Sequence, residues 1–238
     1  MTRSIALLVF AVMLGGCAAS YVTPGGPARL DDIDRVDIAE VASRRPAASF
    51  PARIAVVRVQ AADYRSSTAE PLATGRFSVV PTMELISDDE LNAIGKWDDV
   101  AAVAPLSKLL LPAKLDSFDD LRLAAAKLQA DVLLVYTIDT TFRVQGRGYG
   151  PLALISLGLV PDRDAYVTST ASAVFVDVRS GFVYGVVEAT DKQSGLTNAW
   201  SSSDTVDAKR VATEREACRL LLAEARETWG GIVAEHAG

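Results

Sequence analysis

The sequence predicts a single mixed α/β (α+β) domain, in which helices pack on a sheet that contains both parallel and antiparallel strands. A near-continuous apolar run, Asp131–Asp139, directly follows a helical segment at Phe118–Gln129, which is typical of a central strand covered on both faces. The alternating run Tyr166–Val178 and its partner Phe182–Thr190 predict a long antiparallel hairpin near 166–190. An amphipathic segment, Thr205–Glu235, predicts a C-terminal helix packed on the sheet.

Shorter strands are expected before the central one. Ile54–Val59 is rich in β-branched residues and predicts a buried strand, so we expect folded structure to start at Arg53. Phe77–Val80 predicts a second, shorter strand. The central strand continues after Asp139, as far as Val144.

Helical segments separate these strands. Ser87 and Glu90 form a capping box, with serine at the N-cap and glutamate three residues later, which predicts a helix start. Trp97–Leu111 predicts a looser helical region that is broken at Pro105. In the C-terminal helix, the expected apolar stripe is Val211, Cys218, Leu222, Ala225, Trp229 and Ile232.

The N-terminus has the parts of an export signal that ends at a lipid acceptor. Arg3 supplies a positive charge, and Ser4–Leu14 is an apolar run too short for a transmembrane helix. The sequence Leu14-Gly15-Gly16-Cys17 resembles the lipobox of bacterial lipoproteins, in which a cysteine thiol accepts a diacylglycerol and carries acyl chains such as palmitate. We therefore expect a lipidated Cys17; an ordinary signal peptide with a chance cysteine is the alternative.

The residues after the lipobox indicate where the domain is held. Lipoproteins of Gram-negative bacteria are kept at the inner membrane chiefly by aspartate at the next position, so by resemblance Ala18 favours the periplasmic face of the outer membrane. Prolines and glycines from Pro24 to Pro51 predict a tether, with one short helical stretch around Ile33–Ala42. The chain thus divides into a signal peptide (1–16), the lipidated Cys17 with a flexible tether (17–52) and a folded periplasmic α/β domain (53–238).

Composition excludes several classes of function. A formal net charge of −6 argues against a nucleic-acid binder, which needs a basic face. The single histidine, His236, removes most zinc sites and every Ser-His-Asp or Cys-His arrangement. If Cys17 carries lipid, Cys218 is a lone thiol that is tolerated only when buried, so we expect it in the core. We expect no cofactor, no metal site and no catalytic residue.

Two features leave alternatives open. Asp139, Asp162 and Asp164 form a carboxylate cluster in one interpretation, and are turn formers at strand ends in the interpretation that we favour. The apolar segment Leu152–Val160 either folds back over the core or is an exposed patch for a partner or the membrane surface.

Two segments carry a family resemblance. The stretch Ala124–Tyr136 resembles the "helix, Ala-Asp, strand" joint of periplasmic lipoproteins related to the N-terminal domain of TolB, to the curli secretion channel lipoprotein and to the outer-membrane activators of penicillin-binding proteins. Asp177-Val-Arg-Ser-Gly181 is similar to their hairpin, in which Asp177 is expected to bind turn amides and Gly181 to supply a positive φ. The resemblance covers Arg53–Glu235 and implies a domain that scaffolds or recognises partners in the periplasm.

These features together predict an outer-membrane-anchored periplasmic lipoprotein that acts through protein–protein contacts and is not an enzyme. Its expected partners are the membrane, through Cys17, and an envelope protein or a second copy of the chain. One alternative is a subunit of an oligomeric envelope export or assembly complex. A carboxylate-dependent envelope enzyme is less favoured, because the sequence shows no paired-carboxylate signature.

Overall fold

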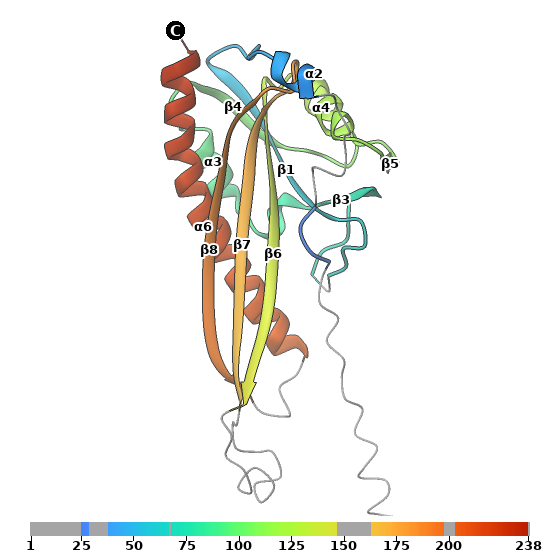
Figure 1. Ribbon diagram of the computed structural model, residues 1–238, viewed down its shortest axis with the longest axis vertical. Coiled ribbons are helices and arrows are strands. Elements are labelled where there is room, and N and C mark those ends of the chain that lie inside the picture. Colours follow the sequence, from blue (N-terminus) through green and yellow to red (C-terminus); the bar gives the residue numbers. More distant parts are fainter. Residues whose placement is uncertain (1–24, 29–37, 67, 147–162, 198–202, 238) are drawn as a thin grey trace, which may run out of the picture.

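A computed structural model describes residues 25–28, 38–66, 68–146, 163–197 and 203–237. It confirms the mixed α/β class: one sheet with helices packed on both faces (Figure 1). In chain order the elements are α2 (Ile38–Ser43), β1 (Ala52–Ala61), β2 (Ala73–Gly75), β3 (Phe77–Val80), a short 3-10 helix (Thr82–Glu84), α3 (Asp88–Ile94), β4 (Val100–Pro105), β5 (Lys114–Leu115), α4 (Phe118–Lys127), β6 (Val132–Gly146), β7 (Arg163–Asp177), β8 (Val183–Thr197) and α6 (Ser203–His236).

The sheet mixes parallel and antiparallel pairs, as predicted. Its strand order is β5-β2-β3-β1-β6-β7-β8. Strand β4 pairs with the first part of β1, and β3 pairs with the last part. The pairs β1–β6, β1–β4 and β2–β5 are parallel, and the others are antiparallel. The helix-to-strand joint at Asp131 therefore feeds β6 into the centre of the sheet, beside β1.

The strands β6, β7 and β8 are the longest of the described residues, at 15 residues each. They form a continuous antiparallel meander that extends beyond the rest of the sheet (Figure 1). The turn between β7 and β8 is the one predicted. Asp177 Oδ1 accepts the amides of Arg179 and Ser180, both at 2.8 Å, and Gly181 has a φ of 69°.

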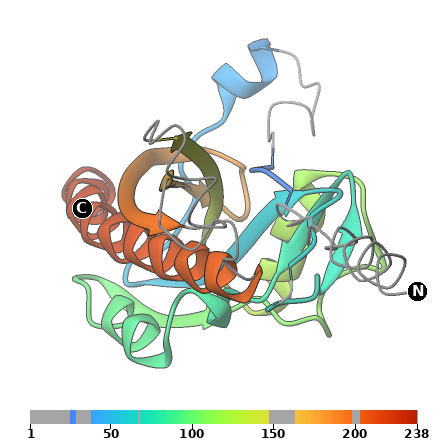
Figure 2. The same cartoon turned by 90° about the horizontal axis from the view of Figure 1, so that it is seen from below.

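The two faces of the sheet bury separate cores. Alternate residues of β1 and β6 point to opposite faces, so each strand contributes to both cores. Ile54 and Leu134 pack with α3 and α6, whereas Ala55 and Leu133 pack with α4. Figure 2 shows α6 running along one side of the curled hairpin, opposite α4 across β1.

Helix α6 confirms the predicted C-terminal helix and is longer than predicted. It continues through Gly230 and Gly231 to His236. Trp229 anchors this part of the helix, because its Nε1 donates to the carbonyl of Asp98 at 2.7 Å and its ring packs against Phe175. On the predicted stripe, the buried residues are Cys218, Ala225, Trp229 and Ile232, and Val211 and Leu222 are half-buried.

The predicted helical region at Trp97–Leu111 is wrong, because its first part forms β4. Helix α3 ends at Ile94, and the chain turns through Asp99, a non-glycine residue with a φ of 54°. The amide of Ala52 then donates to the carbonyl of Asp99 at 2.8 Å, which starts the parallel pairing of β4 with β1. Strands β2 and β5 were not predicted either.

Described parts of the expected tether, 17–52, touch the folded body. The carbonyl of Gly26 accepts the amide of Ala61 at 2.9 Å. Further along, the amide of Ala47 donates to Asp177 Oδ2 at 2.6 Å, and the ring of Phe50 lies 5.7 Å from that of Trp229. The chain is therefore fastened to the sheet at two places before β1 begins.

Candidate functional site

The predicted lipid acceptor, Cys17, lies outside the described residues, as does the apolar segment Leu152–Val160. The other cysteine, Cys218, is a free thiol on the inner side of α6 with 1% of its surface exposed. Burial raises the pKa of this thiol to about 12, against the opposing effect of the positive charge on Arg58. The prediction that Cys218 belongs to the core is confirmed.

The structure does not bring Asp139 and Asp164, two of the three aspartates considered as a carboxylate cluster, close together. Asp162 lies outside the described residues. Asp139 pairs with Thr170, whereas Asp164 pairs with Gln145. Because Asp164 lies six positions from Thr170 along β7, roughly 20 Å separates the two aspartates. The interpretation as a turn former at a strand end is wrong for Asp139, which lies inside β6, whereas Asp164 is the second residue of β7.

A different set of charged side chains meets between β1, the 3-10 helix and α6. We call it the buried charge cluster, and its members are Arg58, Glu84, Asp207, Arg210 and Glu214. The side chains of Arg58 and Arg210 are 0% exposed, and that of Glu214 is 3% exposed. The cluster therefore lies almost entirely out of contact with solvent.

Arg58 occupies the sheet side of the buried charge cluster. Its Nη1 lies 2.5 Å from Glu84 Oε2, and its Nη2 lies 3.7 Å from Glu214 Oε2. The guanidinium also stands over the ring of Tyr64, 5.4 Å from its centroid. Its Nε has no hydrogen-bond partner among the described residues.

Arg210 occupies the helix side of the same cluster. Its Nε donates to Asp207 Oδ1 at 2.9 Å, and its Nη1 donates to Glu214 Oε2 at 2.8 Å. Its Nη2 reaches Ser66 Oγ at 3.2 Å, in the loop that follows β1. Glu214 is shared between the two arginines, and its second oxygen accepts the hydroxyl of Thr140 on β6 at 3.0 Å.

The electrostatics of the cluster keep both arginines charged. Burial by itself lowers the pKa of Arg58, but the neighbouring groups raise it more, so the net shift is upward. Those groups are Tyr64, Tyr136, Glu214 and Glu84. Burial likewise lowers the pKa of Arg210, and Glu214 and Asp207 outweigh that effect. Each buried positive charge is therefore balanced by carboxylates close to it.

The buried charge cluster connects β1, the 3-10 helix and α6, and it presents no charge to a ligand. Neither guanidinium is exposed, and the contacts hold the N-terminal half of α6 against β1 and Ser66. The cluster was not predicted from the sequence. Two signals were available: Arg58 interrupts the apolar run Ile54–Val59, and Arg210 and Glu214 lie four residues apart on α6.

A groove of about 230 Å³ lies between α3 and α6. Its floor is apolar, made by Ile94, Trp97 and Leu222. Arg219 and Arg226 stand two helical turns apart along its α6 wall. Arg219 pairs with Glu216 at 2.6 Å, and Arg226 forms no ion pair with another described residue. The groove can therefore receive an apolar side chain that is flanked by an acidic group.

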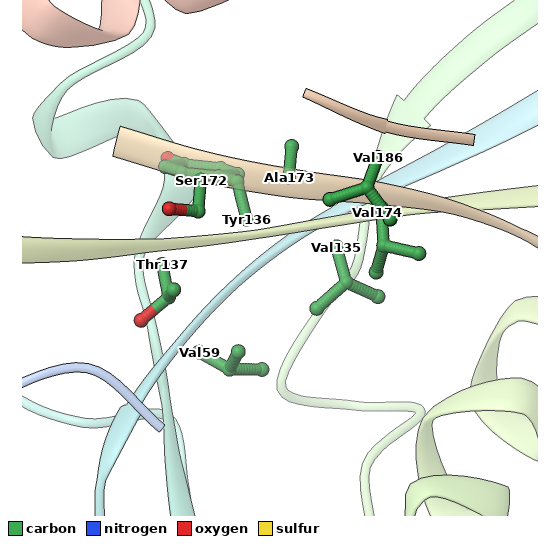
Figure 3. Close-up of a pocket in the computed structure, with 8 residues that line it drawn as sticks. All are labelled: Val59, Val135, Tyr136, Thr137, Ser172, Ala173, Val174 and Val186. Atoms are coloured by element: carbon green, nitrogen blue, oxygen red, sulfur yellow. The ribbon is translucent and has the colours of Figure 1, made fainter. Parts of the chain in front are cut away.

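The opposite face of the sheet has a smaller recess of about 100 Å³. Figure 3 shows Val135 and Val174, from neighbouring strands, pointing into the same space, whereas Ala173 points to the other side of the sheet. Val59 and Val186 complete its apolar wall. Val186 is 68% exposed, so this wall continues onto the open surface of β8.

No helix in the described ranges combines the length and the apolar character needed to cross a membrane. Within the same ranges, no group of three or more histidine, cysteine, aspartate or glutamate side chains is arranged to hold a metal ion.

Comparisons with known proteins found similarity to solved structures alone. No family model matches the sequence, and no curated protein matches it. Protein XCC0632 from Xanthomonas campestris, described under the family model DUF330, is 15% identical with a TM-score of 0.38, over 81% of this chain and 90% of that chain. Lipoprotein GNA1162 from Neisseria meningitidis is 16% identical with a TM-score of 0.31, over 68% and 94%. The PelC dodecamer from Paraburkholderia phytofirmans is 14% identical with a TM-score of 0.25, over 74% and 90%.

Proposed function

We propose that this chain is a lipoprotein held at the periplasmic face of the outer membrane by acyl chains on Cys17. The single observation that carries the proposal is the sequence Leu14-Gly15-Gly16-Cys17, in register behind Arg3 and the apolar run Ser4–Leu14. Several acyl chains on one residue exceed the weak, reversible anchoring that a single chain gives. Ala18 supports the outer membrane as the destination.

The state of Cys218 supports this proposal. A disulfide between the two cysteines of the chain would consume the sulfur that the lipid needs. Cys218 is instead a free thiol in the core. The thiol of Cys17 is then available for lipid, and the lone thiol that remains is shielded from an oxidising compartment.

At the membrane, the domain acts through contacts with other envelope proteins and not as an enzyme. The groove between α3 and α6 supports this part of the proposal. Its apolar floor lies beside Arg226, which has no ion-pair partner among the described residues, and this combination fits a partner segment with one apolar and one acidic side chain. The resemblance of Ala124–Tyr136 to the TolB-related lipoproteins also favours a scaffolding or recognition role. Hydrolysis of an envelope polymer by the purified protein would overturn the non-enzymatic part.

Metabolic labelling with a palmitate analogue tests the anchor. The wild-type chain and Cys218→Ser should incorporate label and sediment with outer membranes, whereas Cys17→Ser should do neither. Ala18→Asp should keep the label and move to the inner membrane. Label on Cys17→Ser, or its absence from the wild-type chain, would refute the proposal.

Site-specific photo-crosslinking in cells tests the groove. A photoreactive residue at Ala223, which lines the groove, should capture a discrete partner. The matched control is Ala208, which is exposed on the same helix outside the groove and should capture none. Ala93→Trp, which fills the groove from α3, should abolish the product at position 223. Equal products at both positions would exclude the groove as a specific contact.

A further inference from the structure

In the described part of the chain, the outer edge of β8 ends the sheet without a partner strand. Strand β8 pairs with β7 along its length, and no backbone hydrogen bond joins it to any other described residue. An unpaired edge is a template for another strand, and natural proteins usually keep such edges short or covered. At 15 residues, β8 is not short.

Helix α6 packs on one face of β8, where Val187 and Ala189 lie, and leaves the other face of the strand open. The helix crosses the sheet diagonally, from Ser66 beside β1, which Arg210 contacts, to Gly185 near the start of β8, which Thr228 approaches. Figure 1 shows the lower part of β8 running clear of α6, and Figure 2 shows the same hairpin end-on beside the helix. The side chains of Glu188, Thr190 and Lys192, in the middle of the strand, are exposed on this open face.

The charges of this stretch are symmetric about its centre. Thr190 is the middle residue of β8, and Glu188 and Lys192 lie two positions before and after it, on the same face of the strand. Each is already positioned on that face by β7: Glu188 Oε2 accepts the hydroxyl of Ser172 at 3.0 Å, and Lys192 stands over the ring of Tyr166, 5.1 Å from its centroid. Neither forms an ion pair with another described residue.

We propose that two copies of this chain pair through the edges of β8, antiparallel and centred on Thr190. A two-fold axis perpendicular to the sheet then places Thr190 opposite the same residue of the second copy. It places Glu188 opposite Lys192 of the second copy, and Lys192 opposite Glu188 of the second copy. This is an isologous contact, in which both copies use the same surface.

The geometry of antiparallel pairing favours this register. A two-fold axis perpendicular to the sheet keeps each side chain on its own face, so Glu188 and the opposing lysine lie on one surface. Directly opposite residues have Cβ atoms about 5 Å apart, which allows two ion pairs to form for each dimer. A slip of one residue would place Glu188 beside Asp191 of the second copy and end both ion pairs.

This inference deepens the proposed function by naming one partner, a second copy of the chain. It rests on the part of that function that assigns protein–protein contacts, and not on the lipid. Failure of palmitate labelling would remove the anchor and leave the edge contact intact. Failure of the experiment below would remove the edge contact and leave the anchor intact.

Cysteine crosslinking of the full chain in intact cells tests the register. Across the proposed axis, the Cα atoms of the two Thr190 residues are about 5 Å apart, within the range of a disulfide. Thr190→Cys should therefore give a product of twice the chain mass on a non-reducing gel. The matched control, Thr170→Cys, lies one strand inward and roughly 14 Å from its counterpart, so it should stay monomeric. Equal crosslinking of the two, no dimer, or a product with another protein would overturn the proposal.

Charge reversal gives a second, independent test that does not depend on a disulfide. Glu188→Lys and Lys192→Glu should each weaken dimerisation of the full chain in detergent by about tenfold, since each replaces two ion pairs by two like-charge contacts. The double variant Glu188→Lys/Lys192→Glu restores both ion pairs and should recover the wild-type dissociation constant. A double variant that is as weak as the single variants would exclude this register.

Discussion

Arg58 and Glu84 form an ion pair of 2.5 Å in which the arginine is 0% exposed and the glutamate 6%. The pair joins a central strand to a one-turn helix, and Glu214 extends it to α6. Removing two charges from water is costly, so such a pair persists where the remaining contacts compensate each charge. The buried charge cluster therefore fixes how α6 docks on the sheet, whatever its net contribution to stability.

Arg58→Met should lower the free energy of unfolding by about 3–5 kcal/mol, because it leaves Glu84 buried without its cation. Urea unfolding of the full chain, followed by circular dichroism, measures the loss. Glu216→Gln is the control, because Glu216 lies on the exposed face of α6 and its pair with Arg219 is open to solvent; it should leave stability unchanged.

The double variant Arg58→Met/Glu84→Gln separates the energy of the interaction between Arg58 and Glu84 from the energy of their other contacts. If the two side chains interact as the structure shows, it should lose less stability than the two single variants combined, by about 1–3 kcal/mol. Strictly additive losses would contradict a direct interaction between Arg58 and Glu84 in solution.

Cys218 should be unreactive in the folded protein. Its pKa is raised to about 12 and it is 1% exposed, so iodoacetamide at pH 8 meets neither a thiolate nor an accessible sulfur. Mass spectrometry should show no modification at Cys218 until urea unfolds the chain, and one modified thiol afterwards. Rapid labelling of Cys218 under native conditions would contradict its place in the core.

The parts of the fold that were predictable are those that bury a periodic apolar pattern. The run at Asp131–Asp139 and the alternation at Tyr166–Val178 predicted β6 and β7, and the capping box at Ser87 predicted the start of α3. Strand β4 was missed because its alanines favour helix locally, and its parallel pairing with β1 outweighs that preference. Strands β2 and β5, of three and two residues, are defined by their partners alone.

The candidate surfaces were less predictable than the fold. The cluster around Arg58 depends on contacts between residues as far apart as 58 and 214, which no local pattern reveals. The groove depends on the crossing of α3 and α6, and the open edge depends on β8 being the last strand of the sheet. The local signals concern the cluster alone: a charged residue inside an apolar strand, and an arginine and a glutamate four residues apart on α6.

Two glycines should respond in opposite directions to alanine. At Gly181 the φ of 69° is unfavourable for alanine, and an added Cβ would lie 3.0 Å from Arg44 Nη1, so Gly181→Ala should cost about 1–2 kcal/mol. At Gly230, inside α6, an added Cβ meets nothing within 4 Å, so Gly230→Ala should stabilise by about 0.5–1 kcal/mol. Thermal unfolding of the two variants measures both changes in stability. An increase in the stability of Gly181→Ala would contradict the positive φ at this turn.

Asp177 should make the stability of the protein depend on acid pH. Burial by itself raises the pKa of this carboxyl, but several donors outweigh burial and hold it below the ordinary 3.8. Those donors are the amides of Ser180, Ala47 and Arg179 and the hydroxyl of Tyr184. Because the folded-state pKa is lower than that of the unfolded chain, the contribution of Asp177 is fully present above the unfolded pKa. It is lost as the pH falls through the folded pKa.

Asp177→Asn should therefore lower the free energy of unfolding at pH 7 and reduce its decrease between pH 5 and pH 2. Urea unfolding across this range measures both effects. The contact of Asp177 with Ala47 adds a second measurement, since the variant should speed hydrogen exchange at the amide of Ala47 while leaving β1 protected. Asp139→Asn, at an exposed position within β6, is the control and should leave the pH dependence unchanged. If the stability of Asp177→Asn decreased between pH 5 and pH 2 as much as that of the wild-type chain, the donors around Asp177 would not lower its pKa in solution.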